Sequence, residues 1–514
     1  MSRTADHVVV GAGVAGLTAA AYLARAGKRP LVLERSDRTG GLVQTFWHEG
    51  FAFDAGVRAL ESAGIIFPML RQLGLSMDVV PSPVSIRVGD ERVRWTSKES
   101  LAAYGDMLKR QFSESSDDVD RIIAVIGKVM VDLDVIYGID NPLFADDMKD
   151  PRYLKDTLLP WFIDYRKSAR TIRAMTAPVE AFLAGMTSNQ ALIDMITQHF
   201  FEGTPAFFAL SYFGLYLDYV YPVGGTGTLP ALLTDFIGTH GGEIRTNAAV
   251  ASVDAERHVL TLEDGDTITY GRLIWAADQQ AFYRMLSGRH SRKAERQRAL
   301  VVSCHAADSV LTVFMGTTMD HAYCRERFGP HAFETPATEG VHSIGDWRAA
   351  EDLWAWIDRY LARTTYEISC PALRDPTLAP AGQTGIIVST LFDYELVRTM
   401  RERGMYDDLK ARCTDKILSV LGAMYPELAE RVRFTLCSTP WTIERMTGNT
   451  EGGLNGWSFT NSVMPAEHRF TKMQKSVRHP IAGIVQCGQW TFSPAGIPTC
   501  ILTGKLAADR VLKN

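Results

Sequence analysis

Near its start the chain reads Val8-Val9-Val10-Gly11-Ala12-Gly13-Val14-Ala15-Gly16, and a later apolar run ends at Glu34. Apolar runs on both sides of a glycine cluster favour a strand, a tight turn, a helix and a second strand. An acid at the end of the second strand completes the pattern of a βαβ unit that binds an adenine dinucleotide. The predicted elements are a strand over His7–Val10, a helix over Leu17–Ala26 and a strand over Arg29–Glu34.

The three glycines of this loop have separate physical roles. Gly11 permits the tight turn, Gly13 allows the backbone to approach a pyrophosphate, and Gly16 lets the helix pack closely on the strand. Free N–H groups and the positive end of the helix dipole would bind the phosphates. The Glu34 carboxylate is expected to accept hydrogen bonds from the ribose hydroxyls. A generic tight turn is the alternative interpretation.

Composition and charge exclude several classes of protein. The chain has 514 residues, of which 46% are hydrophobic and 22% charged, so two or three globular domains are expected. The formal net charge is -5 and no basic stripe is present, which argues against nucleic acid as a partner. Seven cysteines without C-x-x-C spacing favour reduced thiols in the cytoplasm over disulfides or a zinc site. We predict no metal site, no signal peptide and no membrane-spanning segment.

The α/β pattern is interrupted along the chain. Between Glu61 and Tyr221, apolar residues at helical spacing are separated by prolines, which indicates a helical insertion. The sequence therefore predicts an α/β fold with a discontinuous Rossmann-like cofactor domain and a substrate domain that combines a mixed sheet with a mainly helical insertion. The expected parts are 1–80, 221–300 and 471–514 for the cofactor domain, 81–220 for the substrate domain with its helical insertion, and 301–470 for the substrate-domain sheet.

The segments after the insertion return to strand patterns. Glu243–Ala255 is expected as one strand, and Val259–Asp264 with Asp266–Tyr270 as a hairpin. Leu273–Asp278 is expected as a separate buried strand, and Thr499–Leu512 as a closing helix.

Several further motifs resemble one group of flavoproteins. The glycine loop and Glu34 are followed by Gly40-Gly41 and by Gly50-Phe51-Ala52-Phe53-Asp54-Ala55-Gly56, an order similar to the FAD-binding half of flavin amine oxidases and phytoene desaturases. The chain also resembles the phytoene desaturase, carotenoid isomerase and retinol saturase group in its middle and at its end. The segments that carry this second resemblance are Tyr221-Pro222-Val223-Gly224-Gly225-Thr226-Gly227, Cys487-Gly488-Gln489-Trp490 and Ala495-Gly496-Ile497-Pro498.

The resemblance implies a set of positions around FAD. A helix that begins near Pro498 would place its positive end at the flavin ring and stabilise the negative charge of the reduced form. The implied cofactor-binding residues are Gly11, Gly13, Ala15 and Gly16 in the first loop, Glu34 and Arg35 at the adenosine, Gly40, Gly41 and Leu42 at the phosphates, Gly56, Val57 and Arg58 in the next approaching segment, Val250 at the adenine, Gly488 and Gln489 at the ribityl chain, and Gly496, Ile497 and Pro498 at the pyrimidine end of the flavin.

Two positions depart from the family pattern. Gln489 stands where the family usually has an acid, so a ribityl hydrogen bond is kept and a charge is removed. Val57-Arg58-Ala59 stands where the family often has proline, so Arg58 would add positive charge near the flavin. The alternative for Arg58 is a structural salt bridge with Asp54 or another acid. These departures leave the substrate and the reaction direction open.

Arg58 and Trp490 are the candidates for a part in the reaction. Trp490 is expected to face either the substrate or the core. The motif segments contain no paired acids, so no general base is predicted, which fits chemistry carried by the cofactor. An aromatic concentration in the insertion indicates either ordinary core packing or the wall of an apolar tunnel; it consists of Trp161, Phe162, Phe200, Phe201, Phe207, Phe208, Tyr212, Phe213 and Tyr216.

The resemblance implies an FAD-dependent oxidoreductase that exchanges a hydride between flavin N5 and a carbon of a long, apolar, unsaturated substrate. A carotenoid, a retinoid or another isoprenoid lipid would be desaturated, saturated or isomerised. An amine oxidase is the alternative within enzymes, and a non-catalytic flavin-bearing carrier is the alternative of another class. The expected partner is a hydrophobic small molecule, and a lipid substrate favours peripheral contact of the helical insertion with a membrane. The sequence carries no signal for an oligomeric state.

Overall fold

The computed structural model describes residues 2–145, 150–288 and 290–513. One large sheet has the strand order β13-β10-β11-β12-β1-β2-β9, and β19 also pairs with β12. β1 runs parallel to β12 and to β2, as the βαβ pattern requires. The strands are β1 (Ser2–Val10), β2 (Leu31–Leu33), β9 (Glu243–Arg245), β10 (Val250–Asp254), β11 (Val259–Leu262), β12 (Thr267–Trp275), β13 (Leu286–Ser287) and β19 (Ile484–Gln486).

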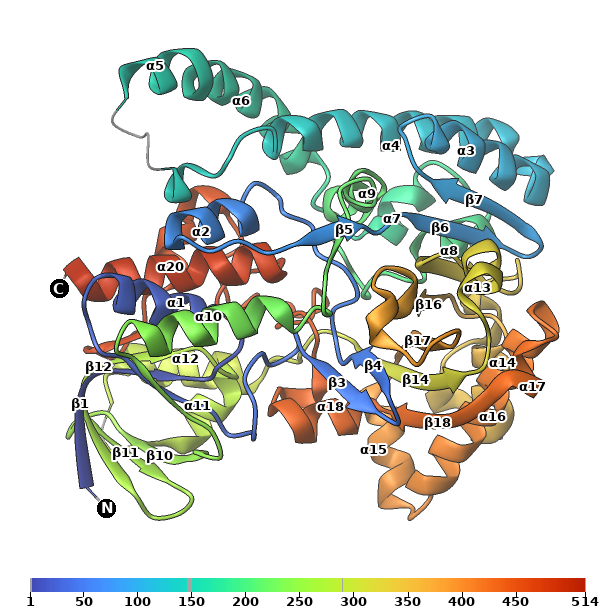
Figure 1. The fold of residues 1–514 in the computed structure, drawn as a ribbon. Coiled ribbons are helices and arrows are strands. Elements are labelled where there is room, and N and C mark those ends of the chain that lie inside the picture. Colours follow the sequence, from blue (N-terminus) through green and yellow to red (C-terminus); the bar gives the residue numbers. More distant parts are fainter. Residues whose placement is uncertain (1, 146–149, 289, 514) are drawn as a thin grey trace.

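Three helices from distant parts of the chain lie together on this sheet (Figure 1). α1 (Val14–Arg25) packs against both α10 (Thr228–Thr239) and α20 (Ile497–Lys513). α1 is rich in buried alanine, which allows close approach. A second core forms around Phe282 of α11 (Gln279–Met285) and Val301 of α12 (Arg292–Val302). The last segment of the chain therefore completes the sheet and the helix layer that the first segment begins.

A second, mixed sheet has the order β18-β14-β17-β16-β15-β6-β7. Its pairs are antiparallel except for β15 with β6. Together the two sheets and their helices form an α/β fold with mixed sheets, which confirms the predicted class. The strands of the second sheet are β6 (Val84–Val88), β7 (Glu91–Trp95), β14 (Ser309–Thr317), β15 (His331–Thr335), β16 (Tyr366–Ser369), β17 (Thr384–Phe392) and β18 (Val432–Ser438).

The helices around the second sheet come from two parts of the chain, the insertion between β7 and β8 and the segments that follow β14 (Figure 1). Between β7 and the short strand β8 (Val220–Pro222) the chain is helical, as expected. No helix among the described residues is long and apolar enough to cross a membrane. The main helices of the insertion are α3 (Ser100–Gln111), α4 (Ser116–Ile136), α6 (Leu159–Ala174), α7 (Val179–Ala184), α8 (Gln190–Thr197) and α9 (Ala206–Leu215), and those after it include α14 (Leu353–Leu361), α15 (Tyr394–Glu402), α16 (Tyr406–Met424) and α18 (Pro440–Thr447).

Two strand predictions were wrong. The expected single strand over Glu243–Ala255 is divided into β9 and β10, because the chain turns at Asn247, whose φ is 51°. The segments Asp266–Tyr270 and Leu273–Asp278 were expected to be separate, yet they join in β12. Gly271 makes this continuity possible, since a Cβ there would lie 2.8 Å from the carbonyl oxygen of Asp6 on β1.

Candidate functional site

The first glycine loop is shaped by contacts that leave no room for side chains at two positions. Gly11 has a φ of 100°, and a Cβ there would lie 2.9 Å from the carbonyl oxygen of Ala276. A Cβ on Gly16 would collide with the carbonyl oxygen of Gly11. These contacts bring the start of α1 against β1 and β12. The predicted roles of Gly11 and Gly16 in the turn and the close packing therefore have a steric basis.

Gly13 differs from its neighbours because space beside it is open. Its φ and ψ are −71° and 173°, which any residue can adopt, and a Cβ there would meet nothing within 4 Å. Gly13 is the N-cap of α1, so the unpaired N–H groups of the first helical turn lie next to this space. Gly40 and Gly41 form a second wall, through a bridge between Gly13 and Gly40 and an approach of Gly41 to the Gly13 Cα. The result is a backbone-lined cradle that fits a pyrophosphate.

The Glu34 carboxylate ties the cradle to the end of β2. One oxygen accepts the Ala12 N–H at 2.8 Å, and the other accepts the N–H and the hydroxyl of Ser36, both at 2.9 Å. A carboxylate has about four acceptor positions, so a further donor can still bind. The sequence suggested a ribose contact for Glu34; the structure adds a loop-holding role that the spacing alone did not indicate.

The segment that leads into β10 runs beside Glu34. The N–H of Ala248 donates to the Glu34 carbonyl at 2.8 Å, and the N–H of Asn247 donates to the Ser36 carbonyl at 2.9 Å. Val250 therefore lies close to the end of β2, where an adenine is expected. Arg35 is exposed and its guanidinium lies against Gly448, at the end of α18.

Two further predicted segments contact residues next to the cradle: Gly56 and Val57 contact Leu42, and Gly488 contacts Ala15. A Cβ on Gly56 would collide with the carbonyl oxygen of Leu42, and the Val57 N–H donates to that oxygen at 3.2 Å. A Cβ on Gly488, whose φ is 98°, would lie 3.3 Å from the Ala15 side chain. Gln489 follows as a half-buried residue.

The third approach is the start of α20. Ile497 begins this helix and, like Val57, packs against the core that contains α1. Gly496 precedes it, and its carbonyl accepts the Cys500 N–H at 2.9 Å. Pro498 is buried in the first turn, where a missing N–H costs the helix nothing.

Trp490 is buried, with 3% of its surface accessible, and packs edge-to-face on Trp457 with ring centroids 4.9 Å apart. The Trp457 indole N–H donates to the Trp490 carbonyl at 2.9 Å. Both rings belong to the core behind the large sheet. A contact between Trp490 and a substrate stays a prediction.

Asp54 is the centre of a buried hydrogen-bond network next to the cradle. It is completely buried, and one carboxylate oxygen accepts three bonds while the other accepts the Tyr221 hydroxyl at 2.6 Å. The three are from the Thr45 hydroxyl at 2.8 Å, the Thr226 N–H at 3.0 Å and the Thr226 hydroxyl at 2.9 Å. The motif around Asp54 and the glycine-rich segment before α10 are thereby held together.

Arg58 does not pair with the carboxylate of Asp54, which was one expectation. It is buried and donates to the Asp54 carbonyl and, at 3.1 Å, to the Ser389 hydroxyl on β17. Its buried Nε has no hydrogen-bond partner among the described residues. Burial lowers the pKa of Arg58, while the charges of Glu367 and Asp54 act in the opposite direction. Arg58 thus connects the cofactor half to the face of the second sheet.

A hydrogen bond between a buried histidine and a carboxylate lies on that face of the second sheet. The Nε2 of His331 on β15 is 2.9 Å from the Glu367 carboxylate on β16. Burial lowers the pKa of His331, so the neutral imidazole donates to the carboxylate. Its Nδ1 is buried and has no partner among the residues described. Glu367 keeps 32% of its side chain accessible although it comes from the middle of the sheet, so this accessible surface faces the interior of the protein.

Aromatic rings from the insertion face the same pair. Tyr219 stacks on His331 with centroids 5.6 Å apart, and Tyr216 lies 5.3 Å from Phe333 of β15. His199 accepts from or donates to the Tyr216 hydroxyl at 3.3 Å, and burial lowers its pKa to about 4. We call this group, together with Glu61, the inner site. It combines apolar walls with a few polar groups, the usual character of a small-molecule site.

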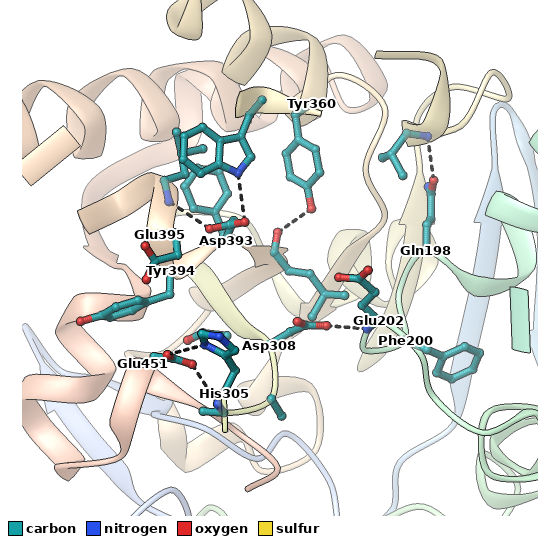
Figure 2. Close-up of a pocket in the computed structure, with 18 of the residues that line it drawn as sticks. Gln198, Phe200, Glu202, His305, Asp308, Tyr360, Asp393, Tyr394, Glu395 and Glu451 are labelled. Carbon is teal, nitrogen blue, oxygen red and sulfur yellow. Dashed lines mark hydrogen bonds and ion pairs between the residues drawn. The ribbon is translucent and has the colours of Figure 1, made fainter. Parts of the chain in front are cut away.

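A separate pocket of about 430 Å³ opens at the ends of β14 and β17 (Figure 2). Figure 2 shows carboxylates of Glu202, Asp308, Asp393 and Glu451 around it, and burial raises the pKa of Asp308 to about 6. None of the predicted cofactor residues lines it. So many carboxylates would repel a pyrophosphate. The seven acids that line this pocket are Glu180, Asp194, Glu202, Asp308, Asp393, Glu395 and Glu451.

Sequence reasoning missed Glu61, His331 and Glu367. His331 and Glu367 are separated by 36 residues and meet only because β15 and β16 pair. Glu61 had a usable signal, since it follows the Gly56–Arg58 segment within one short stretch of the chain.

Comparison with known proteins agrees with this arrangement. The family described as flavin containing amine oxidoreductase matches residues 14–512. An inactive all-trans-retinol 13,14-reductase of Danio rerio is 24% identical over 560 residues, covering 99% of this chain and 85% of that protein. The chloroplastic prolycopene isomerase of Arabidopsis thaliana is 23% identical over 542 residues, covering 98% and 82%.

A solved oxidoreductase from Methanosarcina mazei shares the fold, with a TM-score of 0.62 and 15% identity over 100% of both chains. The family match extends from Val14, the first residue of α1, to Leu512 in the last turn of α20. The chain belongs to the flavin containing amine oxidoreductase family.

Proposed function

We propose that the protein binds FAD and exchanges a hydride with a carbon of a long, apolar, unsaturated substrate of the carotenoid or retinoid type. The observation that carries this proposal is a glycine-lined cradle in which Gly41 and Gly488 approach the first glycine loop from distant parts of the chain, together with the aromatic rings of the inner site. Bound in this cradle, the flavin would supply hydride transfer at its N5.

The residues of the cradle would act by binding and by charge. The free N–H groups at the start of α1 would bind the pyrophosphate, and Glu34 would accept from the adenosine ribose. The buried Arg58 guanidinium and the N-terminus of α20 would favour negative charge on the reduced ring. The aromatic wall of the inner site would exclude water from the reacting carbon.

The substrate class is supported by two features. Relatives at 24% and 23% identity are named for all-trans-retinol and for prolycopene, both polyenes. The inner site is walled by tyrosine and phenylalanine rings that suit an apolar chain.

The proposal is tested by anaerobic reduction of the purified flavoprotein followed by addition of all-trans-retinol or prolycopene. We expect the flavin absorbance to return, or the polyene to isomerise, with the product resolved by chromatography. Hydrogen peroxide release with amines, and no change of either polyene, would instead identify an amine oxidase. A flavin that no added polyene reoxidises when it is reduced, and that no added polyene or amine reduces when it is oxidised, would favour the carrier.

We further propose that α6 touches a membrane surface. Leu159, Phe162 and Ile163 are 56%, 49% and 53% exposed on this helix, which lies at the edge of the molecule in Figure 1. Arg166 and Arg170 follow on the same helix, so both an apolar and a cationic contact are available. We expect sedimentation with vesicles that contain anionic phospholipid.

The double variant Phe162→Ser with Ile163→Ser is expected to lose most of this vesicle binding. Val302, which is 54% exposed on α12, provides the matched control, and Val302→Ser should bind vesicles as the unaltered protein does. Equal binding by the double variant would exclude α6 as the contact.

A further inference from the structure

Glu61 is held at a fixed position by its backbone. The preceding residue, Leu60, forms an antiparallel bridge with Val220, through N–H to carbonyl bonds of 2.8 and 2.9 Å in both directions. In this register Glu61 lies opposite Tyr219. Because Tyr219 stacks on His331, the position belongs to the inner site and not to the protein surface.

The Glu61 charge acts on three hydroxyl-bearing rings. Tyr137 comes from the end of α4, Tyr212 from α9 and Tyr219 from the segment before β8. Burial raises the pKa of each phenol, and the Glu61 charge adds to the effect on all three. These tyrosines therefore remain neutral hydrogen-bond donors and acceptors over the physiological range of pH.

The contacts of the Glu61 side chain do not explain why an acid occupies this position. It is half-buried, and its side chain makes no hydrogen bond or ion pair with another residue of the described ranges. The charges that act on Arg58, on the same segment, are those of Glu367, Asp54 and Arg374. An unpaired carboxyl group is expensive to bury, and such groups gather at functional sites.

We propose that Glu61 is the catalytic acid and base of the inner site, which transfers the proton that accompanies hydride transfer. This inference rests on the proposed function. In saturation, the reduced flavin gives a hydride to one alkene carbon, the π bond breaks, and the Glu61 carboxyl gives its proton to the other carbon. A carboxylate and the oxidised flavin remain. In desaturation the Glu61 carboxylate takes the proton while the oxidised flavin takes the hydride.

The pKa of Glu61 allows it to give a proton in saturation and to take one in desaturation. Burial raises the pKa of Glu61 to about 7, so the acid and the base forms coexist near neutral pH. The titratable groups that face it are Tyr137, Tyr212 and Tyr219, and Glu367 acts on the last two. Saturation requires the protonated form, so its rate should fall as the pH rises through about 7.

The test uses reduced holoprotein in single turnovers with whichever of all-trans-retinol and prolycopene the unaltered protein converts. Glu61→Gln is expected to slow conversion on the order of 10²- to 10⁴-fold, with unchanged flavin content and no pH dependence near 7. Glu61→Asp should restore a pH dependence. An infrared carboxyl band that titrates near pH 7 in the unaltered holoprotein should be missing from Glu61→Gln, which reports protonation without turnover.

Glu180→Gln is the matched control. Burial also raises the pKa of Glu180, but this acid lines the separate pocket of Figure 2, so its variant should keep the rate and the pH profile. An unchanged rate and an unchanged pH profile in Glu61→Gln would overturn the assignment of Glu61 and leave the proposed function standing. If Glu61→Gln does not fold, Glu61→Asp provides the test. A Glu61→Asp variant with the pH profile of the unaltered protein, and with no shift of the infrared band, would overturn the assignment of Glu61. If the unaltered protein converts neither polyene, the proposed function itself fails.

Discussion

Gly13→Asp should remove the flavin and leave the fold intact. Space beside Gly13 is open, and its φ of −71° suits any residue, so the protein itself does not resist a side chain there. Aspartate is also a favoured N-cap, so α1 should gain a few tenths of a kcal/mol. A bound pyrophosphate, in contrast, would lie against the new carboxylate. Two like charges about 4 Å apart repel by about 4 kcal/mol near a protein surface, which weakens binding on the order of 10³-fold.

The measurement is the ratio of flavin absorbance to protein, together with thermal unfolding of the flavin-free protein. Gly13→Ser separates size from charge and should retain more flavin than Gly13→Asp. Gly238 of α10 is equally free of neighbours, so Gly238→Asp places the same charge away from the cradle and should keep its flavin. Full flavin content in Gly13→Asp would place the cofactor elsewhere.

The parts of the fold that depend on local patterns were predictable. The glycine loop, α1 and β2 follow from apolar periodicity and from turns that only glycine tolerates, as at Gly11. The closing helix α20 was predicted for the same reason and begins two residues earlier than expected, at Ile497. The family match then confirmed the group that these motifs resembled.

The strand errors show where local patterns stop being informative. A run such as Glu243–Ala255 reads as one extended segment, but the bend at Asn247 is stabilised by bonds to Ser36 and to Glu34, more than 200 residues away. In the same way the segments on either side of Gly271 were predicted to be separate, while the close contact of Gly271 with Asp6 keeps β12 continuous. Tertiary contacts decided both cases.

The inner site was hidden for a related reason. Glu61, His331 and Glu367 each lie in a stretch of sequence without a recognisable motif, and the hydrogen bond between His331 and Glu367 requires the antiparallel pairing of β15 with β16. Arg58 was singled out from the motif, yet its partners, Ser389 and the carbonyl of Asp54, could not be read from spacing. The sequence therefore pointed to the segments that form the glycine cradle and not to the groups of the inner site.

Asp54→Ala is expected to destabilise the protein by about 3–5 kcal/mol, because it breaks a buried hydrogen-bond network. The carboxylate is fully buried and accepts four hydrogen bonds, from Thr45, Tyr221 and Thr226. Removing it leaves all four donors without their acceptor in a site that water does not reach, and each buried unsatisfied group is costly. Urea unfolding followed by tryptophan fluorescence measures the change in the free energy of unfolding.

Two variants show whether the network or a single bond is responsible. Thr226→Val removes one donor and should cost about 1 kcal/mol, while Asp346→Ala, at a carboxylate that is 57% exposed, should cost less. An Asp54→Ala loss no larger than that of Asp346→Ala would contradict the argument. A large loss would mean that the Asp54 carboxylate joins β4 (Phe51–Asp54) to the segment before α10, and so the acid of the Gly50–Gly56 motif stabilises the fold around the glycine cradle.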